Sequence, residues 1–174
     1  MQLAGPISTA ALGEYRITYR PRVSNKKKMT ERYLRATAFH EAGHVVVAWS
    51  LGLPVGTVSV RNDDASGATE IGPADHLSLV EKVAVCSGGI AADAIFGYQI
   101  NEHAAAYDRA KIMQLIKDNG ISEKEQGPSL RAEGLNCARA HLERHRSKVI
   151  LLAERLFEHG QIEGAEVLRL MQDR

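Results

Sequence analysis

The sequence predicts a mainly α-helical domain with one small β element, and three observations support this fold class. Apolar residues recur at helical spacing over most of the chain, whereas only residues 55–60 alternate in the manner of a strand. Glycine and proline residues separate these stretches. With 174 residues, 44% hydrophobic and 25% charged, the chain has the composition of one globular domain with a substantial core.

The first predicted helix is strongly apolar between residues 33 and 49 and has Glu31 in its first turn. Thr30 is placed to cap its start, and Gly52 is placed to end it. The strand at residues 55–60 follows directly, and the turn-rich stretch at residues 62–67 is expected to be a loop. The small β element is therefore expected beside the first helix.

The remainder of the chain is predicted to be helical, with breaks at glycine and proline. Gly120 and Gly160 are placed to end two helices, and Gly127-Pro128 interrupts the chain between them. Ser122 and Glu125 have the spacing of a capping box, which predicts the start of a short helix. The expected helices cover residues 76–96, 104–118, a short segment at 122–125, a long stretch from Pro128 to His159, and the last turns at 164–171.

The first helix contains the pentapeptide His40-Glu41-Ala42-Gly43-His44. Two histidines four residues apart on a helix project from the same face, so both imidazoles can bind one Zn²⁺. Glu41 lies beside the metal without binding it, where it can act as the general base toward a zinc-bound water. This is the HExxH arrangement of zinc-dependent peptidases.

The alternative for this pentapeptide is that His40 and His44 lie on an amphipathic helix and bind no metal. The surrounding sequence, Phe39 on one side and Val45-Val46-Val47 on the other, is apolar. Burying two histidines and a glutamate in such a helix is costly unless they have a partner. Gly43 in mid-helix costs about 1 kcal/mol relative to alanine, which indicates close packing or a functional requirement. The metal site is therefore favoured.

A third ligand is required, and Asp108 is the strongest candidate by pattern. It shares a helical face with Ala104, Ile112 and Leu115, and a carboxylate in an apolar stripe needs compensation. Spacing alone does not decide between a ligand and an ordinary aspartate near the start of a helix. The other carboxylates downstream of the motif are Asp63, Asp64, Glu70, Asp75, Glu81, Asp93 and Glu102.

Several segments, in order from about Tyr33 to Arg169, resemble the peptidase domain of the FtsH family of ATP-dependent zinc metalloproteases. They are His40-Glu-Ala-Gly-His-Val-Val-Val47, Gly56-Thr-Val-Ser-Val60, Ser87-Gly-Gly-Ile-Ala-Ala-Asp-Ala-Ile-Phe-Gly97, Ala104-Ala-Ala-Tyr-Asp108 and the closing helices. The resemblance implies a zincin-like helical peptidase domain over residues 29–174. It also implies that Asp108 is the third zinc ligand beside His40 and His44.

The function implied is a zinc-dependent metallopeptidase that acts on peptides or unfolded protein segments. We expect the strand at residues 55–60 to pair with the extended substrate. No G-x-x-x-x-G-K-[ST] loop and no 18-residue apolar run occur, so the expectation is a stand-alone domain that binds neither ATP nor a membrane. FtsH-like domains form rings, so a homo-oligomer is compatible with the resemblance.

Two alternatives for the function stay open. In the first, a zinc-stabilised module of the same fold binds a protein partner with little or no catalysis, which the unusual neighbours Tyr107 and Arg109 of Asp108 favour. The intact Glu41 argues against it, because a purely structural site needs no general base. In the second, the enzyme hydrolyses an amide bond other than a peptide bond, since HExxH chemistry does not specify a protein substrate.

The first 28 residues differ from the rest, with six basic residues and one acidic residue. We expect residues 1–28 to be a flexible, solvated extension with a short edge strand at Tyr15–Tyr19. Attraction of this segment to nucleic acid is the less favoured interpretation, because the basic run is short. Met29 is an alternative start of the chain.

Cysteine and histidine usage outside the motif is unremarkable in its pattern. Cys86 and Cys137 lack metal-binding spacing, and without a secretory signal they indicate a reducing cytoplasm. Cys86 lies on an apolar stretch and is expected to be a buried thiol. His141 and His145 repeat the four-residue spacing, but charged neighbours predict a solvated face and not a second metal site.

Overall fold

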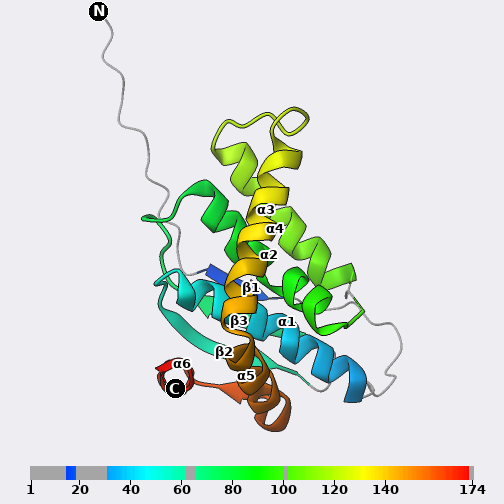
Figure 1. Ribbon diagram of the computed structural model, residues 1–174, viewed down its shortest axis with the longest axis vertical. Coiled ribbons are helices and arrows are strands. Elements are labelled where there is room, and N and C mark those ends of the chain that lie inside the picture. The colour runs from blue at the N-terminus through cyan, green and yellow to red at the C-terminus, as the bar shows by residue number, and fades with distance from the viewer. Residues whose placement is uncertain (1–14, 19–30, 62–65, 100–101, 173–174) are drawn as a thin grey trace, which may run out of the picture.

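The computed structural model describes residues 15–18, 31–61, 66–99 and 102–172 (Figure 1). This part of the chain confirms the predicted class, since it is mainly helical with a small antiparallel sheet. The expected cap at Thr30 lies outside the described residues. The elements in chain order are β1 (Tyr15–Thr18), α1 (Glu31–Ser50), β2 (Val55–Val60), β3 (Gly67–Ile71), α2 (Leu79–Phe96), α3 (Glu102–Asp118), α4 (Gly127–Arg144), α5 (Arg146–His159), β4 (Gln161–Ile162) and α6 (Gly164–Gln172).

Helix α1 is the centre of the fold. Its residues 37–48 are all buried, and it packs against α2, α5 and the strands β2 and β3. Gly43 of α1 faces Gly88 of α2 so closely that a Cβ on Gly43 would overlap the backbone of α2. This contact explains the mid-helix glycine, because the two helices can approach this closely only without a side chain there. Gly52, with φ of +79°, follows the end of α1.

The sheet has four antiparallel strands in the order β1-β3-β2-β4. β3 pairs with β1 along one edge and with β2 along the other. β2 is irregular between Val55 and Val58, and beyond this bulge it pairs with β4, where Val58 lies opposite Ile162. The strand predicted at residues 55–60 is therefore confirmed, but it is an inner strand. Both of its edges carry partners, so β2 has no free edge for the expected pairing with a substrate.

Two further strands bear on the predictions for this region. The edge strand expected at Tyr15–Tyr19 is confirmed as β1, so part of the segment 1–28 belongs to the fold. β3 was not predicted: the expected loop at residues 62–67 ends where this strand begins. Its five residues include Gly67 and Glu70, which weaken the strand signal, and pairing on both sides supplies the stability that its own sequence lacks.

Helix α2 begins three residues later than the predicted start at His76. Ser78 caps it by a reciprocal capping box, in which Glu81 N–H donates to Ser78 Oγ while a Glu81 side-chain oxygen accepts from Ser78 N–H. The short helix expected at residues 122–125 is absent, and this stretch forms hydrogen-bonded turns. Glu125 N–H still donates to Ser122 Oγ, so the cap forms without a separate helix behind it.

The single long helix expected between Pro128 and His159 is two helices, α4 and α5. His145 separates them with φ −114° and ψ 30°, and its N–H still bonds to the carbonyl of His141. Its ring packs edge-on against Trp49 of α1, with ring centroids 5.1 Å apart. No glycine or proline marks this break in the sequence. The break coincides instead with the contact between His145 and Trp49 of another helix.

Two hydrophobic clusters hold these elements together. The larger one surrounds α1 and includes residues from α2, α4, α5, α6 and the sheet. The smaller one joins α2 and α3 to the start of α4 through Val83, Cys86, Ile112, Leu115, Ile116 and Leu130. Cys86 is 1% exposed, which confirms the predicted buried thiol. Within the described residues, no helix is both long and apolar enough to cross a bilayer.

Candidate metal centre

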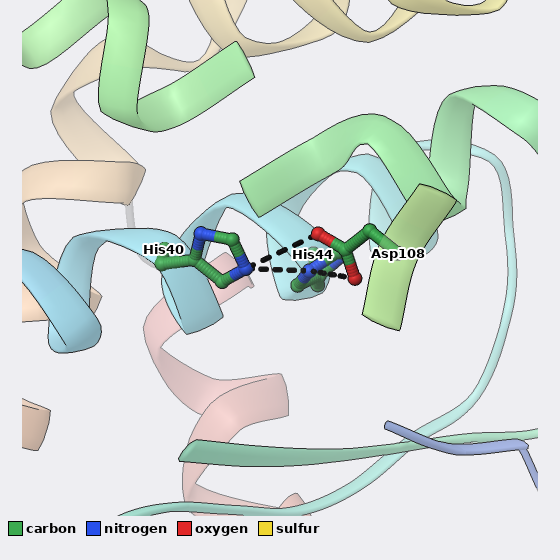
Figure 2. Close-up of side chains that lie close together, drawn as sticks. All are labelled: His40, His44 and Asp108. Atoms are coloured by element: carbon green, nitrogen blue, oxygen red, sulfur yellow. Dashed lines mark hydrogen bonds and ion pairs between the residues drawn. The ribbon is translucent and has the colours of Figure 1, made fainter. Parts of the chain in front are cut away.

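His40 and His44 on α1 and Asp108 on α3 converge on one point, as Figure 2 shows. The Nε2 atoms of the two histidines are 3.3 Å apart. Asp108 places one carboxylate oxygen 3.2 Å from Nε2 of His40 and the other 3.4 Å from Nε2 of His44. All three residues are at most 3% exposed. The structure therefore brings the three sequence-predicted ligands together from two helices far apart in sequence.

The second nitrogen of each ring determines what the converging atoms can offer. Nδ1 of His44 lies 2.9 Å from the carbonyl oxygen of Val85, which can only accept a hydrogen bond. Nδ1 of His40 lies 2.9 Å from a carboxylate oxygen of Asp93, which when ionised is also an acceptor. We therefore assign the proton of each neutral ring to Nδ1. Both Nε2 atoms then direct lone pairs toward each other and toward Asp108.

This arrangement leaves three acceptor groups facing one another without a donor. Oδ2 of Asp108 is buried and has no hydrogen-bond partner among the described residues. A buried carboxylate beside two imidazole lone pairs is unfavourable unless a cation or bound protons compensate it. The residues therefore fit a metal ion. Two imidazoles and one carboxylate suit Zn²⁺ in a catalytic site, although Fe²⁺ uses the same donor types.

The pKa shifts of the metal-free site follow from the same geometry. Burial lowers the pKa of His40, but its interactions with Asp108 and Asp93 outweigh this and hold the pKa well above its ordinary value. Burial likewise lowers the pKa of His44, and Asp108 more than reverses the effect. Burial raises the pKa of Asp108, yet the two histidines hold it far below its usual range. Without a metal, the site therefore favours bound protons where a cation would otherwise lie.

Glu41 lies next to His40 in the sequence and is 2% exposed. Thr69 of β3 donates a hydrogen bond from Oγ1 to a carboxylate oxygen of Glu41 at 2.6 Å. Burial raises the pKa of Glu41, although the neighbouring histidines and Thr69 oppose the shift. A carboxylate with a raised pKa is suited to take a proton and return it near neutral pH. The sequence predicted Glu41, but nothing in it marked Thr69 as its partner.

Two glycines make room for the side chains of the site. A Cβ on Gly89 of α2 would overlap Nε2 of His40, and a Cβ on Gly67 of β3 would overlap a carboxylate oxygen of Glu41. The His40 ring and the Glu41 carboxylate therefore each occupy a space that only glycine leaves open. One glycine makes room for the candidate ligand His40 and the other makes room for Glu41.

These two glycines provide a matched pair of substitutions. Gly89→Ala should displace the His40 ring and lower the affinity for zinc, whereas Gly67→Ala should displace Glu41 and leave zinc binding nearly intact. Each variant should also lose about 1–3 kcal/mol of stability through overpacking. Zinc titration followed by thermal unfolding separates the two effects. Equal zinc affinity in both variants would contradict the assignment of Gly89 to the His40 pocket.

Asp93 is a residue of the site that the sequence argument did not select. It lies on α2, is 2% exposed, and accepts the hydrogen bond from His40 Nδ1. Burial raises its pKa, and the bond to His40 opposes this shift only in part. A carboxylate that holds the far nitrogen of a histidine ligand fixes the ring and increases its basicity. In the sequence, Asp93 is visible only as a single acidic residue in a helical stretch rich in alanine and glycine.

Replacing Asp93 with asparagine should weaken zinc binding by about 10–100-fold, which is the usual effect of losing such a partner. The amide can still occupy the space, so the fold should persist. Competition with a chelator of known affinity measures the change. Asp75→Asn, at an exposed position before α2, is the control and should leave the zinc affinity unchanged.

The remaining candidates for metal binding are separate from this site. His141 and His145 are half-buried, so the predicted solvated face is wrong. Nδ1 of His141 lies 2.8 Å from Ser50 Oγ, and His145 packs on Trp49. The described residues contain no other group of three metal-ligating side chains with this spacing.

The other carboxylates have different partners or positions: Glu70 accepts from the backbone of Thr57, Glu81 caps α2, Glu102 pairs with Arg109, and Asp63 and Asp64 lie outside the described residues.

Comparison of the sequence with known protein families and with curated proteins finds no match. The geometry of the site and the HExxH motif are therefore the observations that bear on function.

Proposed function

We propose that this protein is a zinc-dependent metallopeptidase of the HExxH type, with a zincin-like domain similar to the FtsH peptidase domain. The observation that carries the proposal is the convergence of His40, His44 and Asp108 next to the buried carboxylate of Glu41. A purely structural metal site would not require a glutamate with its own hydrogen-bond partner and its own space beside the ligands.

The ligands would be Nε2 of His40, Nε2 of His44 and a carboxylate oxygen of Asp108. A bound Zn²⁺ would supply Lewis acidity for a substrate carbonyl and would lower the pKa of a water molecule toward 7. Asp93 and the Val85 carbonyl hold the two rings in the tautomer that presents Nε2. Asp108 balances charge in a site that excludes solvent.

Glu41 carries out the proton transfers in this proposal. Thr69 fixes one of its oxygens, which leaves the other to accept a proton from the attacking water. The protonated Glu41 would then pass this proton to the departing amine. The reaction class is hydrolysis of a peptide bond in a peptide or an unfolded segment.

The two alternatives make different predictions. A zinc-stabilised binding module would need the three ligands but would gain nothing from Glu41 and its bond to Thr69. A hydrolase for another amide bond would keep the same chemistry and differ only in its substrate. The contacts of Glu41 therefore favour an enzyme over a module, and they do not separate the two kinds of amide substrate.

The test combines metal content with substrate profiling. Protein purified without chelator should contain about one zinc per chain by mass spectrometry, the stoichiometry of such a site. The zinc-loaded chain should cleave members of a mixed peptide library, and a chelator should abolish the cleavage. Protein that binds no metal at neutral pH would contradict the proposal. Zinc binding without any cleavage would favour the module.

A further inference from the structure

Strand β3 borders the catalytic carboxylate, and among the described strands its outer edge is the one next to the site that does not pair with β2. Gly67 and Thr69 of β3 both contact Glu41. The inner edge of β3 pairs with β2, and β2 pairs with β4 on its other side. Among the described strands, an extended peptide could therefore reach Glu41 by strand pairing only along the edge of β3 that faces away from β2.

That outer edge is occupied by β1, a segment of the same chain. β1 runs antiparallel to β3 from Tyr15 opposite Ile71 to Thr18 opposite Ala68. The residue opposite Thr69, the partner of Glu41, is Ile17. β1 is thus an extended segment of four residues, paired with the strand whose Thr69 side chain binds Glu41.

The burial of the site indicates that something must move before a substrate binds. His40, Glu41, His44 and Asp108 are each at most 3% exposed, so a peptide carbonyl has no access to them in this arrangement. β1 is short and lies at the edge of the sheet. A four-residue edge strand with a partner on one side only contributes little stability, so its displacement is expected to cost little.

We propose that the outer edge of β3 is the peptide-binding edge of this site, and that β1 is its intramolecular occupant. Resting on the proposed peptidase function, this inference identifies the substrate as an extended peptide that replaces β1, antiparallel to β3. A tethered segment competes at an effective concentration on the order of millimolar. Free peptides below that concentration therefore bind poorly until β1 leaves, which makes β1 an autoinhibitory strand.

The first test measures binding and does not depend on hydrolysis. The probe is a fluorescein-labelled peptide with the sequence of residues 13–20, added to full-length, zinc-loaded Glu41→Gln protein. Adding Arg16→Pro and Ile17→Pro removes at least one ladder hydrogen bond of β1, because alternate residues of a strand face the neighbouring strand. Fluorescence anisotropy should show at least tenfold tighter binding to the proline variant. Arg16→Ala with Ile17→Ala keeps the backbone N–H groups and serves as the matched control.

The second test locks β1 in place. Thr18 and Ala68 lie opposite each other, so Thr18→Cys with Ala68→Cys can form a disulfide between β1 and β3. The oxidised full chain should bind the probe at least tenfold more weakly than the same chain reduced with a phosphine, and Thr18→Cys alone should show no redox effect.

Equal affinity of the proline and alanine variants for the peptide would overturn the proposal. If the proline variant does not fold, unchanged binding on oxidation of the cysteine pair would overturn it instead. The binding test uses the Glu41→Gln protein and needs no hydrolysis. If the peptidase proposal is wrong, the cleavage assay shows it, and the binding test is unaffected. Binding without cleavage would retain β3 as a peptide-binding edge of a module.

Discussion

Replacing Glu41 with glutamine is expected to lower the rate of peptide hydrolysis by about 10²–10⁴-fold, the usual contribution of a general base. The amide is nearly the same size and can still accept the hydrogen bond from Thr69, so the packing around it should be kept. The zinc content should also be kept, because Glu41 is not among the converging ligands. Cleavage of a fluorogenic peptide and metal analysis of the same sample measure both results.

The matched control for this variant is Glu31→Gln. Glu31 belongs to the same helix but is exposed in its first turn, so its substitution should leave both activity and zinc content unchanged. Full activity in the Glu41→Gln protein would remove the general base from the mechanism. A binding function that persists unaltered in this variant, with no cleavage in either protein, would identify a zinc-stabilised module.

Replacing Asp108 with alanine is expected to abolish stabilisation of the protein by zinc. For a ligand that binds only the folded state, a concentration 100-fold above the Kd stabilises by about 2.7 kcal/mol. For a chain of this size that corresponds to a rise in Tm of roughly 5–10 °C. Loss of the carboxylate should weaken zinc binding by more than about 100-fold, so the same zinc concentration should barely move the Tm.

Asp118→Ala is the control for this experiment, because Asp118 lies at the exposed end of the same helix. It should show the same zinc-induced rise in Tm as the unaltered protein. Thermal unfolding is recorded with zinc and with a chelator for all three proteins. If the Asp108→Ala protein gains as much Tm from zinc as the unaltered protein, Asp108 is not a ligand and a different third group must be sought.

The parts of the fold that the sequence predicted are those with strong local signals. The apolar stretch of α1, the alternation of β2 and the glycines just past α3 and α5 are all visible in the local sequence. β3 was missed because its strand character comes from its two neighbours. The break at His145 was missed because it involves a contact with Trp49, a residue nearly 100 positions away.

The site shows the same division between local and distant information. The spacing of His40 and His44 on one helix predicted their convergence, and the apolar face of α3 favoured Asp108. Asp93 and Thr69 are isolated polar residues on elements whose packing against α1 brings them to the site. No periodicity or spacing connects them to the motif. Partners of this kind become visible only once the tertiary structure is known.

The two helices that supply the ligands are linked by a long excursion of the chain. Roughly 60 residues separate His44 from Asp108, and this stretch contains β2, β3 and all of α2. An ion bound by both helices would close that stretch into a loop, as a disulfide does. α3 also attaches to the fold through the smaller hydrophobic cluster and through Tyr107, which packs against the larger one. The metal would thus cross-link α1 and α3, and its removal would weaken the attachment of α3 to α1.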